Sequence, residues 1–435
     1  MVTLSFLDTL LILLYFAVVV FIGFRSVRKE KTSTDEYLLA GRSLTLPVFV
    51  ATLVSTWYGG ILGVGEYSYR YGISNWVVFG VPYYFFAIIF AFVLAKKART
   101  TNLATIPDKL YEAYDMKTSL LGAMLTFVLV SPAPYVLMLG ILVQLVFGTS
   151  LVTSILLSTF LTVCYLYAGG FRSDVNTNIV EFILMFAGFA IIIPFAYAKF
   201  GGFDFLQSNL PPLHLTWHGG NSLQFIFVWF FIALWTLVDP AFHQRCYAAK
   251  DGATAQKGIL ISTLCWFVFD FFTSTAGLYA RAAMPHLQQP LLAYPMLAEI
   301  TLPSVAKGMF YIGMLATIMS TLSSLTFIGA VTIGNDIIGR LLVQEEKDIR
   351  SAAITLWTKF GLVISASFAV VLALWIPSVV KLWYVIGTAI IPGLLVPLIT
   401  SYFERLKIPA AFAFAAMLFG WSVSTLWLLW GQMNG

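Results

Sequence analysis

Five hydroxyl side chains gather near the middle of the long apolar segment 304–335. They are Thr317, Ser320, Thr321, Ser323 and Ser324. At 3.6 residues per turn, Thr317, Thr321 and Ser324 share one stripe of a helix, and Ser320 lies beside them. A polar stripe on a membrane helix has two uses: hydrogen bonds to a neighbouring helix, or oxygen ligands for a bound ion. This segment alone leaves both uses open.

The composition indicates many membrane-spanning helices. The chain has 435 residues, of which 60% are hydrophobic and 10% charged, whereas a soluble domain carries about 25% charged residues. The recurring apolar segments predict an all-α polytopic membrane protein with about 12 transmembrane helices. The predicted spans are 5–24, 46–70, 75–97, 118–147, 150–169, 176–200, 222–247, 256–281, 304–335, 351–376, 379–402 and 408–432.

The basic residues predict the orientation of these spans. They concentrate in the loops of one side, beginning with Arg25 and Arg42, and such loops face the cytoplasm. The opposite loops hold only Arg70, Lys199, Arg281, Lys307 and Lys381. We therefore expect a multi-pass protein of the plasma (inner) membrane, with the N-terminus and the C-terminus both outside. Basic residues scattered over short loops do not indicate a nucleic-acid partner.

Two of the predicted spans are interrupted. The span 46–70 contains Tyr58-Gly59-Gly60, and the span 222–247 contains Asp239-Pro240. Unwound backbone at membrane depth is tolerated where it lines a cavity. Each interrupted span opens a block of five spans, and adjacent blocks of five have opposite topology. Interrupted helices at matching places in inverted halves are typical of the substrate site of a secondary transporter.

This pattern divides the chain into five parts. They are an N-terminal extra helix with a cytoplasmic loop (1–45), a first five-helix repeat (46–200), an outer loop (201–221), a second, inverted five-helix repeat (222–402) and a C-terminal extra helix (403–435).

Four motifs, in order along the chain, resemble those of the sodium:solute symporter family. They are Asp35–Leu44 (DEYLLAGRSL), Gly169-Gly170-Phe171, Gln244–Lys250 (QRCYAAK), and Ser320–Ser324 (STLSS) running on to Asn335-Asp336-Ile337. The resemblance extends to the proline, sugar and choline symporter branches, the last through Trp57-Tyr58-Gly59-Gly60. It implies a LeuT-type core of two inverted five-helix repeats, with one extra helix at each end.

The resemblance also implies a sodium site. The family's ion-binding carbonyls fall on Ser55, Tyr58 and Thr317, and its hydroxyl ligands fall on Ser320 and Thr321. Neutral oxygens suit a hard monovalent cation. Ser323 and Ser324 are left as helix-packing residues.

One departure from the family lies on the expected path of ion exit. Relatives carry an Asp where this chain has Asn178, and Glu181 follows three residues later on the same helical face. Glu181 is a candidate to supply the missing charge. Because of this departure, we retain a proton-coupled or weakly coupled carrier as an alternative function.

Two further ionisable residues lie inside predicted spans, Asp270 and Lys359. An intramembrane charge is a functional hypothesis by default, and the plain alternative is a carboxyl paired with a neighbouring helix. Lys359 is a candidate partner of Asp270.

Solute contacts are expected from the two interrupted spans and from the span after the first. Aromatic rings there suit a sugar face or, through cation–π contact, a cationic group. Asp239 and the resemblance to choline carriers favour a solute that bears an amine. The candidates are Trp57, Tyr58, Glu66, Tyr83, Tyr84, Trp235 and Asp239.

The sequence therefore predicts sodium-coupled symport of a small organic solute into the cytoplasm by alternating access. A transporter-like membrane sensor is a remote alternative, because no signalling module follows the last span. No nucleophile–base constellation or metal cluster points to an enzyme. We expect no cofactor and no metal beyond Na+, which serves as the coupling ion; the other partners are the solute and the lipid bilayer.

Overall fold

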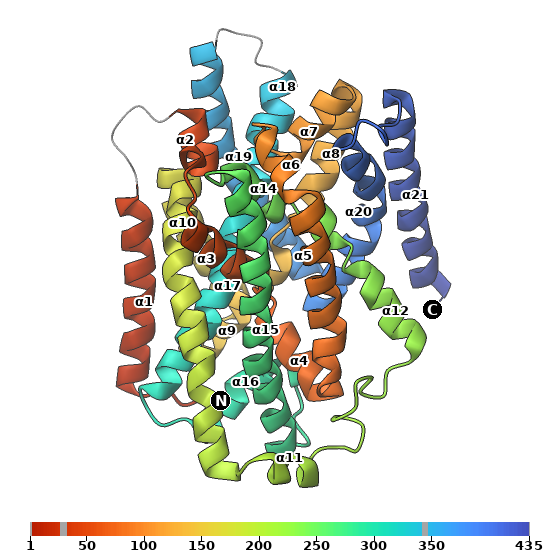
Figure 1. Cartoon of the computed structure of the whole chain (residues 1–435). Coiled ribbons are helices and arrows are strands. Elements are labelled where there is room, and N and C mark those ends of the chain that lie inside the picture. Colours follow the sequence, from red (N-terminus) through yellow and green to blue (C-terminus); the bar gives the residue numbers. More distant parts are fainter. Residues whose placement is uncertain (1, 27–32, 342–346, 435) are drawn as a thin grey trace.

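The computed structural model describes residues 2–26, 33–341 and 347–434. Within these ranges the chain is helical, and the elements cross between two ends of the molecule (Figure 1). Helix α1 (Phe6–Arg25) begins at Ser5, whose hydroxyl accepts the Asp8 N–H while the Asp8 carboxylate accepts the Ser5 N–H. This capping box fixes the N-terminus of α1 at Ser5. The short helix α2 (Thr34–Leu39) follows.

The predicted first repeat begins with a broken helix and ends with a very long one. Its spans are formed by α3 (Leu46–Trp57), α4 (Ile61–Tyr71), α5 (Val81–Val93), α8 (Met116–Leu129), α9 (Ala133–Phe147) and α10 (Leu151–Phe200). Two short helices, α6 (Ala95–Thr100) and α7 (Ile106–Ala113), lie between α5 and α8.

The predicted second repeat also begins with a broken helix. Its spans are formed by α12 (Leu223–Ile232), α13 (Trp235–Val238), α14 (Pro240–Ala248), α15 (Gly252–Ala283), α17 (Ala306–Val331), α19 (Lys347–Trp375) and α20 (Val379–Ser401). The short helices α11 (Phe203–Asn209), α16 (Ala293–Thr301) and α18 (Gly339–Leu341) lie in the connections, and α21 (Ala410–Asn434) ends the described chain.

The helices agree with the predicted number of spans. Ten helices of the described ranges are long and apolar enough to cross a membrane, or 11 if the bent pair α3–α4 forms one span. Helix α10 has 50 residues, about 75 Å at 1.5 Å per residue, whereas the hydrocarbon core is about 30 Å thick. Gly170 leaves the helical conformation (φ 57°, ψ −143°), so α10 holds two of the predicted spans.

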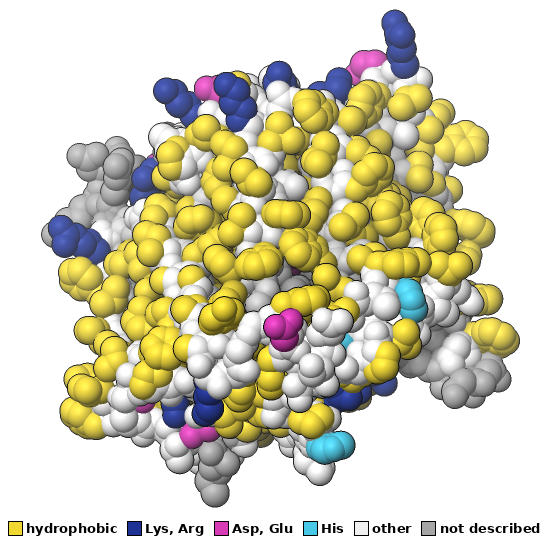
Figure 2. Space-filling model, turned by 60° about the horizontal axis from the view of Figure 1, so that its bottom comes forward, with side chains coloured by type: hydrophobic (Ala, Val, Ile, Leu, Met, Phe, Trp, Pro, Cys, Tyr) yellow, Lys and Arg dark blue, Asp and Glu magenta, His cyan; other side chains and the backbone are white. Residues whose placement is uncertain are grey.

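Helix α17 lies in the interior of the helix bundle, and α21 lies at its edge. In α17 and its continuation to Leu341, 94% of the apolar window is buried, against 11% for α21. Figure 1 shows α1 and α21 at opposite margins, with both termini toward the same end of the molecule. Hydrophobic side chains form a broad belt over the face in Figure 2, with most Lys and Arg toward its edges, as a bilayer requires.

Candidate functional site

The helix break between α3 and α4 depends on two glycines. The two helices meet at an angle of 60°, and Tyr58-Gly59-Gly60 joins them. A Cβ at Gly59 would collide with the Thr321 side chain, and one at Gly60 would lie 2.5 Å from the Trp383 ring. Only a residue without a side chain lets α17 and α20 approach the unwound backbone this closely.

The hydroxyls of α17 meet this unwound segment. Ser320 Oγ donates to the Ser55 carbonyl oxygen at 2.8 Å and lies 3.0 Å from the Thr317 carbonyl oxygen. Thr321 Oγ1 donates to the Thr56 carbonyl oxygen at 2.6 Å. The same Oγ1 lies 3.4 Å from each of the Ser55 and Thr317 carbonyl oxygens. The structure therefore brings together four of the five predicted ion ligands, and it adds Thr56.

Tyr58, the fifth predicted ligand, contributes only its backbone to the neighbourhood of the α17 hydroxyls. Its side chain turns away from the α17 hydroxyls, and its phenol donates to Asp270 and lies 2.9 Å from Thr273 Oγ1. Its backbone is next to Gly59, which packs on Thr321. Ser320 and Thr321 are buried, at 0% and 1% exposure. The cluster is thus a dry group of neutral oxygens drawn from two helices, a donor set that suits a small monovalent cation.

Asn178 lies beside this cluster. Its amide Nδ2 donates to Ser324 Oγ at 3.1 Å and lies 3.4 Å from Thr56 Oγ1. Glu181 is buried one turn further along α10 and accepts the Tyr15 hydroxyl of α1 at 3.2 Å. The same Tyr15 hydroxyl lies 3.4 Å from Met319 Sδ of α17. Asn178 therefore reaches the hydroxyl stripe, and Glu181 makes its hydrogen bond elsewhere.

The carboxylate that does reach the stripe is Asp174, which the sequence analysis missed. It accepts hydrogen bonds from Ser323 Oγ at 2.7 Å and Ser324 Oγ at 2.8 Å, and it pairs with Arg245 at 3.2 Å. Ser323 and Ser324 do link helices, as expected of packing residues, but their partner is a charge. The available signal was an Asp one helical turn before Asn178, in the polar stretch between the predicted spans 150–169 and 176–200.

The second break lies at Asp239, before α14. Its Oδ1 accepts the backbone N–H groups of Ala241 at 2.8 Å and Phe242 at 3.0 Å, and its Oδ2 accepts Trp235 Nε1 at 3.1 Å. Asp239 is therefore the N-cap of α14, with Pro240 in the first turn. Both carboxylate oxygens already accept hydrogen bonds from the protein.

A cavity of about 140 Å³ lies between the two breaks. An engineered protein cavity of about 150 Å³ holds a benzene molecule, so a small solute fits here. Five of the predicted solute-binding residues line the cavity: Trp57, Tyr58, Tyr83, Trp235 and Asp239. Further lining residues were not predicted, among them Asp270, Phe79, Tyr135, Trp229, Trp383 and Tyr384.

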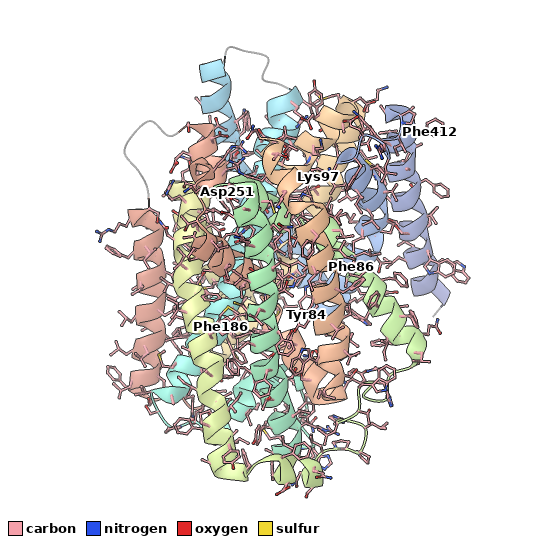
Figure 3. All side chains as sticks on the ribbon, in the orientation of Figure 1. Tyr84, Phe86, Lys97, Phe186, Asp251 and Phe412 are labelled. Atoms are coloured by element: carbon pink, nitrogen blue, oxygen red, sulfur yellow. The ribbon has the colours of Figure 1, made fainter. Side chains whose placement is uncertain are left out.

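Two predicted solute contacts lie outside the cavity lining. Glu66 forms an ion pair with Arg70 at 3.0 Å, one turn along α4, so its carboxylate is directed to the surface. Tyr84 projects from α5 toward α15, where its hydroxyl donates to Asp270 (Figure 3). Tyr84 therefore supports a lining residue and does not itself line the cavity.

The predicted pairing of Asp270 with Lys359 is wrong. Asp270 accepts hydrogen bonds from Tyr58 and Tyr84. Lys359 Nζ lies over the rings of Tyr37 and Tyr167, with centroids at 5.8 and 5.1 Å. The ammonium group is thus satisfied by cation–π contacts near α2. Asp270 has no ion-pair partner within the described part of the chain.

The comparison with known proteins decides the family. The sequence model of the sodium:solute symporter family matches residues 37–420. The chain belongs to the sodium:solute symporter family. Its members are transporters and not enzymes, so the chain is a multi-pass membrane transporter, and sodium is the coupling ion that the family implies.

Several individual members are similar to this chain. The sodium/pantothenate symporter of Escherichia coli (strain K12) is 28% identical over 403 residues, covering 87% of this chain and 81% of the relative. The sodium/proline symporter of Staphylococcus aureus (strain JH9) is 23% identical over 450 residues, covering 97% and 86%. The high-affinity choline transporter 1 of Drosophila melanogaster is 23% identical over 398 residues, covering 86% and 63%.

Solved structures share the fold. A Na+-coupled sialic acid symporter in a substrate-bound outward-open state superposes with a TM-score of 0.78 at 14% identity, covering 97% of this chain and 96% of the other. Mhp1, a nucleobase-cation-symport-1 family transporter, gives a TM-score of 0.62 at 14% identity, covering 89% and 84%. The predicted LeuT-type fold is confirmed.

Proposed function

We propose that this symporter couples the entry of one small organic solute to sodium and moves both into the cytoplasm by alternating access. The observation that carries the proposal is the contact of the Ser320 and Thr321 hydroxyls with carbonyl oxygens of the α3 break, at 2.6 to 2.8 Å. These oxygens lie on two different helices, so a cation held among them joins α3 to α17.

The proposed ion ligands are the carbonyl oxygens of Ser55, Tyr58 and Thr317 and the hydroxyl oxygens of Ser320 and Thr321. Each hydroxyl now donates to a carbonyl. It would turn a lone pair toward the ion on binding and give up that hydrogen bond. The neutral set compensates part of the hydration that a single charge loses, whereas a divalent ion would need carboxylates.

Ion and solute are coupled because they share residues. Thr56, Tyr58 and Thr321 lie at the break and also line the cavity. An ion that orders the break therefore orders part of the solute site. The coupling is reciprocal, so the solute raises sodium affinity by the same factor.

In the proposed cycle, the bundle of α3–α4, α5, α12–α14 and α15 rocks against the remaining core helices. The energy comes from the ion gradient and the membrane potential, about 2.3 kcal/mol per charge per 100 mV. Sodium then leaves along α10, past Asn178, which reaches the hydroxyl stripe; Glu181 lies farther from the cytoplasmic end of this helix. Both termini lie outside the plasma (inner) membrane in this proposal, as the basic loops indicate.

The cavity lining favours a solute that bears an amine. Aromatic rings dominate it, and its charged members are two acids, Asp239 and Asp270, with no base among the described lining residues. Asp239 accepts backbone N–H groups that are fixed at the α14 N-terminus, whereas Asp270 accepts the side-chain hydroxyls of Tyr58 and Tyr84. Because hydroxyls can rotate, Asp270 is the acid better placed to face a cationic group. Rings and a carboxylate together suit an ammonium.

Proton coupling is the second candidate, and Asp270 is the observation that favours it. This carboxyl lines the cavity, and within the described ranges it is surrounded by hydroxyls and has no cation beside it. A carboxyl in that setting is a natural carrier of a proton.

The test has two stages. First, purified protein is screened for thermal stabilisation by amino acids, sugars, carboxylates and quaternary amines, in sodium chloride and in potassium chloride. Second, uptake of the stabilising solute into proteoliposomes is measured under separate sodium and proton gradients. We expect uptake only with the sodium gradient. Uptake driven by protons with no effect of sodium would contradict the proposal.

A further inference from the structure

A second, smaller cavity lies next to the solute cavity, on the side of the basic loops. Its volume is about 20 Å³, which is room for about one water molecule. Its lining includes the polar side chains of Thr126, Gln244 and Thr332. The Thr126 hydroxyl is buried and has no hydrogen-bond partner within the described part of the chain. We call this space the lower cavity.

The lower cavity shares three walls with the solute cavity, and on each wall the lining residue is displaced by three or four positions, which is about one helical turn. The residue pairs are Val130 and Thr126 on α8, Ala241 and Gln244 on α14, and Leu325 and Ile328 on α17. All three displacements lead the same way, because α14 and α17 run toward the basic loops and α8 runs away from them. The two cavities therefore lie in line across the membrane.

A thin apolar layer separates the two cavities. Val130, Ala241 and Ile328 form a small hydrophobic cluster of their own, and Leu325 packs against it. We call these four residues the septum. In the proposed cycle α14 moves with the rocking bundle, whereas α8 and α17 belong to the remaining core helices. The movement would therefore separate Ala241 from Val130 and Ile328.

The lower cavity is also closed on the side away from the septum. Thr105, just before α7, lines it and donates its hydroxyl to Asp336 Oδ1 at 2.6 Å. Tyr247 of α14 lines it as well, and its hydroxyl lies 2.8 Å from that of Tyr402 at the end of α20. The contact between the two tyrosines again joins α14 to a core helix, so the same movement would open this side too.

We propose that the septum is the cytoplasmic gate of this transporter, and that the lower cavity is the first space the solute enters on release. The inference rests on the proposed function and adds the route of release and the side chains that close it. The proposed sodium ligands of α3 and α17 lie together in the arrangement in which the septum is closed. Sodium therefore favours the closed gate.

The test places single cysteines on the two sides of the septum. The native Cys164, Cys246 and Cys265 are replaced by Ala, and either Leu129→Cys in the solute cavity or Thr126→Cys in the lower cavity is added. A trimethylammonium methanethiosulfonate, which does not cross membranes, is applied in sodium chloride to right-side-out or inside-out vesicles. Mass spectrometry then measures the modified fraction of the protein.

We expect Leu129→Cys to react from the outside and Thr126→Cys to react from the cytoplasmic side alone. Adding Ile328→Ala leaves a cavity where the side chain stood, so Thr126→Cys should then react from the outside as well. The matched control is Ile364→Ala, which removes the same atoms from a side chain of α19 that is 37% exposed. With this control, Thr126→Cys should stay unreactive from the outside.

The outcomes separate the two proposals. If Leu129→Cys reacts from neither side, the cavity is not a solute site and the proposed function fails. If Leu129→Cys reacts from the outside and folded Thr126→Cys/Ile328→Ala does not, the septum is not the gate and the inference is overturned. Equal reaction of Leu129→Cys and Thr126→Cys from the outside, with the septum intact, would also overturn it. Should Thr126→Cys not fold, Thr332→Cys on the α17 side of the lower cavity gives the same test.

Discussion

The two broken helices differ in which end of a helix they present to the cavity. At the first break, between α3 and α4, the groups that face α17 are the carbonyl oxygens of Ser55 and Thr56, and these accept Ser320 and Thr321. The second break begins α14, so its exposed groups are N–H donors, and Asp239 caps them. Two similar interruptions in the sequence therefore have opposite electrostatic character.

The difference explains why only one break is suited to an ion. Carbonyl oxygens at the end of α3 carry partial negative charge, and a bound cation can replace the Ser320 and Thr321 hydroxyl protons that they now accept. At the second break the chain supplies its own anion, Asp239, which leaves the N-terminus of α14 without free donors for a solute carboxylate. In our proposal the second break therefore shapes the cavity wall, and the first break binds the sodium ion.

The largest effect is expected from Gly59→Ala at the first break. The added methyl group would collide with Thr321 Oγ1 and push α17 from the break. Overpacking of this kind costs about 1 to 3 kcal/mol, so we expect the half-maximal sodium concentration to rise, by up to about a hundredfold. Sodium-dependent thermal stabilisation measures it. The matched control is Gly431→Ala, where a Cβ meets nothing within 4 Å; equal effects of the two variants would contradict the account.

Asp239 tests the second break. Asp239→Ala removes the cap of α14 and should lower the free energy of unfolding by about 1 kcal/mol, whereas Asp239→Asn keeps a capping oxygen and should change it little. Denaturation of the purified variants measures both. If sodium affinity falls in Asp239→Asn as strongly as in Gly59→Ala, then the two breaks do not differ as described.

Asn178→Asp gives a smaller effect near the first break. The new carboxylate would lie beside Ser324 and Thr56, where Asn178 now donates its amide. We expect the variant to fold and to bind sodium about two- to fivefold more tightly, because burial at this position strengthens the attraction. A sodium titration of binding measures it; weaker binding would place Asn178 off the ion path.

The smallest effect is expected from Glu66→Gln, on the outer part of the first broken helix. The substitution removes an ion pair with Arg70 whose side chains are 23% and 50% exposed. Surface pairs contribute about 0 to 1 kcal/mol, so solute uptake should change by less than about twofold. A loss of uptake would instead indicate that Glu66 contacts the solute.

Local patterns predicted the framework of the site, and tertiary packing supplied the rest. Gly59-Gly60 indicated the first break, and the spacing of Ser320 and Thr321 indicated the face that meets it. Asp174 could not be placed from sequence, because the residue of α10 that faces α17 depends on how the helices rotate against each other.

Two of the contacts that the structure shows had readable signals in the sequence. Glu66 and Arg70 are four residues apart, the spacing of a helical ion pair. Asp239 precedes a proline, which is typical of a helix start. The pairing of Asp270 with Lys359 carried no such signal, since it joined distant helices by charge alone.

The most direct test of the central claim is binding of radioactive sodium to the purified Ser320→Ala/Thr321→Ala variant. Each hydroxyl contributes about 1 kcal/mol, so we expect affinity to fall about thirtyfold relative to the wild type. The control is Ser158→Ala/Thr162→Ala, whose hydroxyls bond to their own helix, and its affinity should be unchanged. Sodium affinity equal to the wild type in the Ser320→Ala/Thr321→Ala variant would contradict the placement of the ion between α3 and α17.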